Sequence, residues 1–504
     1  MGASNLVLPL LRQAKTNPSR IALDVGGTAL TYAQLSESAG RIAGWIGQGT
    51  QPATGRIAIL ASRNWEGYAG VLGAAWAGAA YVPINPSWPA ARIEQLLAIA
   101  KPDGIIADSA GASLIASGTL PDCHVPTLAP GRQMPSEPIP PPADIADKQI
   151  AYVIFTSGST GVPKGVLVSN ASVNSFLCGM RDRYVLTADD RLSQASELTF
   201  DVSVFDMFMA WNAGASLHVV PKSQLMAPRD FIRDKSITAW FSVPSIAIFM
   251  QRMKMLAPGS FPKLRYSLFA GEPLPAATAS AWQLAAPNSS VENLYGPTEA
   301  TVVCLGCRFS GEADITPGRG TVSTGIELAG VDAAILDDDL HAVSPGASGQ
   351  LAISGQQLAE GYLADPELTS SRFPTIAGRR WYLTGDLACV DERGVFHHLG
   401  RIDNQIKVHG HRVELEEVES HLRTHAKTDA VVAIPWRVSF GSAEGIVAFI
   451  SDSAVPLLEL QQALKSQLPS YMVPAEIRTL DKLPLGPSGK FDRKALMELM
   501  EHGK

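Results

Sequence analysis

The chain is poor in cysteine and in net positive charge. Its 504 residues contain five cysteines, and its formal net charge is −7. So few cysteines are typical of a protein in a reducing compartment, and we expect a cytoplasmic location. Cys304 and Cys307 form one CxxC pair with no second pair, so we interpret them as core thiols. The acidic balance argues against binding to nucleic acid through its phosphates.

Apolar segments long enough to cross a membrane are also lacking. The nearest candidate is residues 68–84, YAGVLGAAWAGAAYVPI, which is interrupted by three glycines and a proline. This pattern predicts a buried helix that runs into a strand. Residues 1–20 have no basic segment ahead of their apolar stretch, so we expect no signal peptide. We therefore expect no membrane partner.

The length exceeds what one hydrophobic core supports, so at least two domains are expected. Short β-like runs alternate with helical stretches over residues 20–120 and again over 150–330, which is typical of layered α/β structure. Residues 331–400 predict a small antiparallel β unit. The last hundred residues predict strand–helix–strand–strand–helix–strand. The fold class is therefore α/β, with a large N-terminal domain (1–402) and a small, mobile α+β C-terminal domain (403–504).

A loop rich in glycine and hydroxyl groups, TSGSTGVPKG (156–165), follows the predicted strand QIAYVIF. Its glycines allow successive backbone N–H groups to turn inward, and Lys164 adds a positive charge. The loop predicts a polyphosphate-binding site; a flexible surface loop is the alternative. It differs from the G-x-x-x-x-G-K-[ST] loop because Pro163 stands where that motif needs a backbone donor.

Further motifs follow in order along the chain. They are LTYAQL (30–35), AGAAYVPINPSWPAARI (77–93), TFDVSVFDMF (199–208), NLYGPTEA (293–300), GQLAISGQQLAEGYL (349–363), YLTGDL (382–387), GRIDNQIKVHGHRVELEEVE (400–419), LPSYMVP (468–474) and PSGKFDR (487–493). Together with the loop, they resemble the adenylate-forming superfamily, and within it the amino-acid adenylation branch of nonribosomal peptide synthetases. The resemblance covers nearly the whole chain.

The resemblance implies that a carboxylate and ATP form an acyl-AMP with Mg²⁺ as cofactor, and that the acyl group then moves to a thiol. It implies a pyrophosphate side formed by Thr156, Ser157, Gly158, Ser159, Thr160 and Lys164. It implies an adenine site formed by Gly271, Glu272, Pro273, Asn293 and Tyr295, with Tyr295 stacking on the base. Thr298 would contact phosphate, Glu299 would hold Mg²⁺, Asp386 would bind the ribose hydroxyls, and Arg401 would approach the ribose or phosphate.

Two residues would handle the substrate itself. Asp201 matches the aspartate that pairs with the α-ammonium in amino-acid-activating members; the alternative is a helix N-cap. Lys490 matches the catalytic lysine on the mobile domain that bridges carboxylate and phosphate oxygens. The chain departs from the family pattern at Ser488, where Asn is usual, and at His409, where Arg is more common.

The matching pocket positions predict a small, neutral, mostly apolar amino acid. They are Asp201, Val202, Phe205, Ser245, Leu268, Ala270, Leu294, Val302, Val303 and Lys490. Apart from the two charged anchors, only Ser245 is polar. The chain resembles stand-alone prolyl– and D-alanyl–carrier protein ligases, so L-proline is favoured, followed by alanine, serine and valine. The sequence does not distinguish amino acids that differ by one methylene, because one methylene changes the binding free energy by only ~1–3 kcal/mol.

The expected partners are a free amino acid and the phosphopantetheine thiol of a separate carrier protein, because only fourteen residues follow Lys490. Asp403 matches the family's hinge, and Gly410 would flank the pantetheine path, unless it is a simple turn glycine. Two alternatives remain. An acyl- or aryl-CoA synthetase is disfavoured by Asp201. A non-catalytic nucleotide-binding scaffold is disfavoured by the intact Lys164, Glu299, Asp386 and Lys490.

Overall fold

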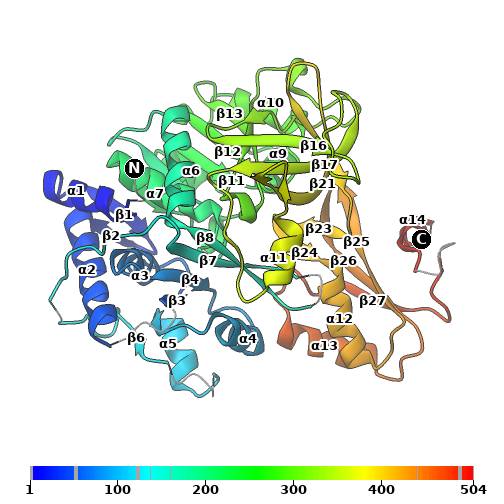
Figure 1. Cartoon of the computed structure of the whole chain (residues 1–504), viewed down its shortest axis with the longest axis horizontal. Helices are drawn as coiled ribbons and strands as arrows, with labels where there is room; N and C mark the ends of the chain where they lie inside the picture. Colours follow the sequence, from blue (N-terminus) through cyan, green and yellow to red (C-terminus); the bar gives the residue numbers. More distant parts are fainter. Residues whose placement is uncertain are drawn as a thin grey trace.

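A computed structural model describes residues 4–49, 55–120, 125–136, 138–158, 161–439, 441–485 and 491–502. The earlier part of the chain forms a broad body of sheets and helices, and the last hundred residues form a smaller body beside it (Figure 1). The predicted α/β class with a large N-terminal and a small C-terminal part is confirmed. The boundary at residue 403 stays a prediction.

The first large sheet is parallel in its centre and antiparallel at both edges. In spatial order its strands are β15 (Ile326–Glu327), β14 (Leu305–Arg308), β13 (Ser290–Tyr295), β12 (Tyr266–Phe269), β11 (Ala239–Ser242), β9 (Arg191–Gln194), β10 (Ser216–Val219), β1 (Ile21–Val25) and β2 (Thr28–Thr31). Central strands such as β11 are buried along their whole length, as expected for a parallel sheet covered on both faces.

The second large sheet carries the glycine-rich loop at one end. Its order is β18 (Gly361–Tyr362), β8 (Lys164–Ser169), β7 (Ile150–Thr156), β4 (Ala80–Ile84), β3 (Arg56–Leu60), β5 (Gly104–Ala107) and β6 (Thr127–Leu128). The loop connects β7 to the antiparallel β8, so it leaves the end of a buried strand as the sequence predicts. The segment 68–84 forms the end of a buried helix and then β4, as predicted.

Helices pack between the two large sheets and on their outer faces. Between the sheets lie α2 (Tyr32–Gly49), α3 (Trp65–Trp76), α6 (Asn170–Arg183) and α7 (Val202–Ala213), with α1 (Leu8–Thr16) beside them. The outer faces carry α4 (Ala90–Ala100), α5 (Ser109–Ala116), α9 (Pro244–Arg252) and α10 (Ala276–Ala285); α8 (Arg229–Asp234) and the short η1 (Lys222–Gln224) lie in connections. The main apolar core fills the layer between the sheets.

An antiparallel unit follows, as the sequence predicts for residues 331–400. Its strands are β16 (Val331–Leu336), β17 (Ser348–Gly355), β21 (Tyr382–Val390) and β22 (Phe396–Arg401), beside the hairpin β19 (Thr375–Ile376) and β20 (Arg379–Arg380). Three short helices lie in or near this part: η2 (Thr298–Ala300), η3 (Glu312–Asp314) and α11 (Pro366–Arg372). No described helix is long and apolar enough to cross a membrane.

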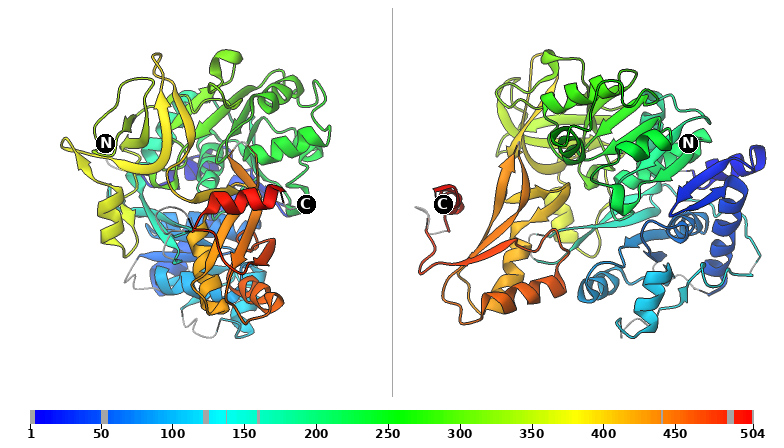
Figure 2. Two further views of the ribbon diagram at one scale, coloured as in Figure 1. Left: turned by 90° about the vertical axis from the view of Figure 1, so that its right-hand side faces the viewer. Right: turned by 180° about the vertical axis from the view of Figure 1, so that it is seen from behind.

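The C-terminal part has its own sheet and apolar clusters. The chain runs through β23 (Gln405–Val408), β24 (His411–Glu414), α12 (Leu415–Ala426), β25 (Val431–Ser439), β26 (Ser442–Ile450), α13 (Leu457–Gln467) and β27 (Glu476–Thr479). The predicted first strand is therefore a hairpin. A further helix that was not predicted, α14 (Arg493–His502), packs on β25 on the side away from the N-terminal part (Figure 2).

Candidate active site

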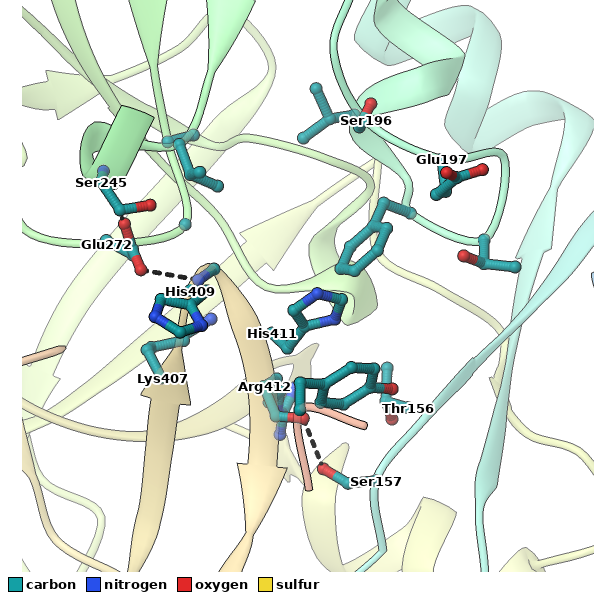
Figure 3. A pocket seen from close by; sticks show the side chains of 18 of the residues that line it. Thr156, Ser157, Ser196, Glu197, Ser245, Glu272, Lys407, His409, His411 and Arg412 are labelled. Atoms are coloured by element: carbon teal, nitrogen blue, oxygen red, sulfur yellow. Dashed lines mark hydrogen bonds between the residues drawn. The ribbon is translucent and has the colours of Figure 1, made fainter. Parts of the chain in front are cut away.

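One cavity of about 1300 Å³ lies between the N-terminal part and the β23–β24 hairpin. Residues far apart in the sequence line it together, including Thr156, Ser157, Glu272 and Arg412 (Figure 3). The structure brings the following predicted residues to this one cavity: Thr156, Ser157, Asp201, Val202, Ser245, Ala270, Gly271, Glu272, Pro273, Asn293, Leu294, Tyr295, Thr298, Val302, Asp386, Arg401 and Gly410.

Other predicted residues lie elsewhere or outside the described residues. Gly158 and Lys164 lie in the glycine-rich loop (156–165), the predicted phosphate loop, and Glu299 lies beside it; all three contact the C-terminal part. Phe205, Leu268 and Val303 are buried behind the cavity wall and do not line it. Asp403 follows β22, where it pairs with Arg401. Ser159, Thr160 and Lys490 lie outside the described residues.

Asp386, on β21, is the centre of a polar group. The Tyr295 hydroxyl donates to its Oδ2, and Arg401 Nη1 lies 2.9 Å from its Oδ1. His398 Nε2 lies 3.3 Å from the same Oδ1. Burial opposes ionisation, but the hydrogen bond with His398 and the charge of Arg401 hold the pKa of Asp386 below its usual range. Asp386 is therefore a fixed carboxylate that can accept hydrogen bonds from a diol.

Asp201 stands at the first turn of α7 and faces the cavity. Asp201 occupies the N-cap position of α7, as the alternative predicts, but its side chain makes no capping hydrogen bond. Burial raises the pKa of Asp201 to about 6, although hydrogen bonding to Thr298 and the charge of Lys407 oppose this rise. A carboxylate whose charge is costly to bury is suited to pair with a ligand cation.

An aromatic pair packs behind the cavity wall, and neither ring lines the cavity. Phe205, on α7, meets Phe241, on β11, edge to face with ring centroids 5.2 Å apart. Both rings are almost fully buried, and Leu268 lies opposite Phe241 in the register of β11 and β12. This packing explains why Phe205 and Leu268 do not line the cavity. Phe241 was missed from sequence.

Glu299, in η2, is fully buried and held by two partners. Arg412 Nη1 lies 2.9 Å from its Oε2, and the Tyr362 hydroxyl donates to its Oε1 over 2.8 Å. Burial opposes ionisation, but the charges of Arg412 and Lys164 lower the pKa of Glu299 to about 2. Glu299 is therefore an ionised oxygen donor of the kind that Mg²⁺ prefers.

The surroundings of Glu299 fit a metal held partly by phosphate. No group of three or more His, Cys, Asp or Glu side chains that could hold a metal lies in the part of the chain that the structure describes. Mg²⁺ in phosphoryl-transfer sites is typically bound by one or two carboxylates together with substrate phosphates and water. A single carboxylate beside a phosphate loop matches that pattern.

The β23–β24 hairpin supplies side chains to which the sequence assigned no role. Lys407 and Arg412 are register partners on the two strands, and both line the cavity. His411 stacks on Tyr471 with ring centroids 3.7 Å apart and meets Phe200 edge to face. Burial and the nearby His409 lower the pKa of His411 to about 4. The sequence signal that could have identified these residues is the cluster of basic side chains in KVHGHR (407–412).

Comparisons with known proteins agree with this geometry. The family model described as AMP-binding enzyme matches residues 10–363. Surfactin synthase subunit 1 of Bacillus subtilis is 32% identical over 505 residues, which cover 96% of this chain and 13% of that protein. Gramicidin S synthase 2 of Brevibacillus brevis is 34% identical over 503 residues, which cover 96% of this chain and 11% of that protein. The chain thus spans a small part of these relatives.

Solved structures match along the whole chain. The Vibrio cholerae adenylation domain AlmE, in complex with glycyl-adenosine-5′-phosphate, has a TM-score of 0.89 and 31% identity, covering 98% of this chain and 97% of its own. IdnL7 has a TM-score of 0.73 and 34% identity, covering 99% of each chain. The family model and these relatives show that the chain belongs to the AMP-binding enzyme family, in the branch of the nonribosomal peptide synthetase adenylation domains.

Proposed function

We propose that the chain activates a small neutral amino acid as aminoacyl-AMP and transfers it to the phosphopantetheine thiol of a separate carrier protein. Enzymes of this family use ATP with Mg²⁺. The observation that carries the proposal is Asp201, a carboxylate that lines the cavity. A fatty acid or aryl acid has no ammonium group to pair with this charge.

The described residues support separate roles for individual side chains in adenylate formation, the first step. The substrate carboxylate attacks the α-phosphate of ATP, and pyrophosphate leaves. Asp201 orients the amino acid through its ammonium group, while Asp386 and Tyr295 orient the nucleoside. Glu299 would hold Mg²⁺, which neutralises charge on the phosphates when it is bound. Positioning of this kind accounts for a large share of phosphoryl-transfer catalysis.

The apolar residues at the predicted pocket positions support a small neutral substrate. Of those positions, Val202, Ala270, Leu294 and Val302 line the cavity. L-proline is our first candidate, with alanine, serine and valine next. The AlmE structure contains glycyl-adenosine-5′-phosphate, so glycine belongs in the test. Ser245 is a weaker candidate for contact with the amino-acid side chain. Its backbone N–H donates to Glu272 Oε2, and Glu272 is predicted to lie at the adenine site.

The position of the hairpin supports the thiol-transfer step. Gly410 lines the cavity, and its N–H donates to Glu272 Oε1 over 2.6 Å. In this step the pantetheine thiol attacks the aminoacyl carbonyl, and AMP leaves. We propose that residues 403–504 rotate about Asp403 between the two steps and that the protein is cytoplasmic. Lys490 would act in the domain arrangement that forms the adenylate, before this rotation.

Amino-acid-dependent ATP–pyrophosphate exchange over the standard amino acids and D-alanine tests the first step. We expect one small neutral amino acid to dominate and Mg²⁺ to be required. The second step is tested by comparing holo carrier protein with free coenzyme A as acceptor. Best turnover with a fatty or aryl acid, or faster acylation of coenzyme A than of any carrier, would favour a CoA synthetase. Preference for D-alanine would identify a D-alanine–carrier protein ligase.

A further inference from the structure

The phosphate loop is engaged by side chains and backbone of the C-terminal part. Ser157 Oγ donates to the carbonyl oxygen of Arg412 over 2.9 Å and accepts from the N–H of Glu414 at 3.2 Å. The N–H of Gly158 donates to Glu417 Oε2 over 3.1 Å. Lys164 Nζ lies 3.4 Å from Glu414 Oε1. The Gly158 N–H and Lys164 therefore contact two carboxylates of the C-terminal part, and the Ser157 hydroxyl contacts its backbone.

The contact between Glu417 and Arg92 is almost completely buried. Glu417 has no exposed side-chain surface, and its Oε1 lies 2.7 Å from Arg92 Nη1 in the N-terminal part. The charge on Glu417 is therefore compensated only while the two parts are in contact. Burial raises the pKa of Glu417, and Arg92 opposes that rise. A buried charge of this kind is costly once its partners are removed.

The C-terminal part also places a cation at the predicted Mg²⁺ position. Glu299, the predicted Mg²⁺ ligand, is paired with Arg412, whose Nη1 lies within 3.2 Å of both carboxylate oxygens. Arg412 lies directly before the segment with the two glutamates. Residues 412–417 thus present one cation to Glu299 and two anions to the loop.

We infer that Arg412, Glu414 and Glu417 are positioning residues that replace magnesium pyrophosphate at the phosphate loop. The guanidinium takes the place of the metal, and the two carboxylates take the place of the phosphates. This inference rests on the proposed function for its place between the two steps. The docked arrangement and bound magnesium pyrophosphate exclude each other, because they use the same donors and the same carboxylate.

The test measures competition directly, with Mg²⁺ and inorganic pyrophosphate as the probe. A fluorescence energy-transfer pair on the exposed Cys178 (α6) and on Leu458→Cys (α13) reports the domain arrangement in the full chain; Cys123→Ser and Cys389→Ser keep the label off these two cysteines. Magnesium pyrophosphate is titrated in the presence of AMP. This readout does not require amino-acid activation, so it remains informative if the proposed function fails.

The docked arrangement is the one described above, in which residues 412–417 contact the loop. In the wild-type chain, pyrophosphate should change the energy-transfer efficiency from the value of this docked arrangement. Glu414→Gln and Glu417→Gln should each lower the midpoint by about tenfold or more, the effect of weakening one hydrogen-bonded charge. Glu416→Gln is the matched control, because Glu416 lies in the same turn but bonds Asn404 within the C-terminal part. Its midpoint should stay within about twofold of wild type.

Two results would overturn the inference. One is a wild-type signal that pyrophosphate does not change. The other is a midpoint in both Glu414→Gln and Glu417→Gln equal to that of Glu416→Gln, with all three variants folded by thermal melting. If exchange finds no activated amino acid but the midpoints shift as expected, the proposed function fails and the competition stands. If exchange succeeds and the midpoints do not shift, the proposed function stands and the competition between pyrophosphate and residues 412–417 fails.

Discussion

Gly410 lies directly against Val243. A Cβ built on Gly410 would lie 2.5 Å from Val243 Cγ1, and the backbone of Gly410 has φ +82°. A side chain at this position is therefore strained and also collides with the N-terminal part when the hairpin is docked. The contact joins the predicted thiol path to the wall of the nucleotide site.

Gly410→Leu should leave ATP–pyrophosphate exchange largely intact and slow the loading of a holo carrier protein by about tenfold or more. Asp403→Pro should act in the same direction by restricting the proposed hinge. Gly346→Leu is the control, because Gly346 has φ +86° with no atom near its Cβ position. Normal loading by both test variants would contradict the carrier-ligase proposal.

Arg412→Gln removes the partner of a fully buried carboxylate. Breaking a buried ion pair costs on the order of 3–5 kcal/mol, so the docked arrangement should become rare. Single-turnover transfer from preformed adenylate should slow much more than exchange does. Arg423→Gln, which disrupts an ion pair within α12, is the control. Equal losses in both half-reactions for Arg412→Gln would argue against this role.

The affinity for the amino acid should depend on the charge of Asp201. Because burial raises the pKa of Asp201 to about 6 in the free protein, the carboxylate is lost as the pH falls through this value. The KM for the amino acid should then rise by up to about tenfold per pH unit below 6. Asp201→Asn should bind poorly at every pH and lose this dependence. An unchanged profile in Asp201→Asn would exclude the ammonium contact.

Lys490 lies outside the described residues, and its role stays a prediction from the sequence. Lys490→Ala should slow adenylate formation by roughly 10²-fold or more, the scale for deleting one donor to transition-state charge. Transfer from preformed adenylate should change far less. Rapid-quench measurement of each half-reaction separates the two steps, and a similar loss in both would refute the assignment.

Asp206, inside α7, should make stability depend on pH. It is buried, its Oδ2 has no hydrogen-bond partner among the described residues, and burial raises its pKa well above the ordinary value. The stability that its neutral form contributes is present below the unfolded pKa and declines as pH rises toward the folded pKa. The melting temperature of Asp206→Asn relative to wild type should therefore increase from pH 5 to pH 8. Asp182→Asn, at an exposed position, should show no such trend.

Local pattern was enough to predict much of the fold and the location of the site. The alternation of strands and helices, the buried helix and strand within 68–84, and the loop after β7 follow from periodicity and from glycine placement, which act over short stretches of chain. The motif order was enough to predict the family. Both depend on information that neighbouring residues carry.

Tertiary structure decided what depends on contacts between distant segments. Phe205 packs against Phe241 and does not line the cavity, although sequence matching placed it in the lining. The pairing of Arg412 with Glu299 and of Glu417 with Gly158 depends on how the C-terminal part docks. Charge pairing across such an interface is set by three-dimensional proximity, and no spacing along the chain encodes it.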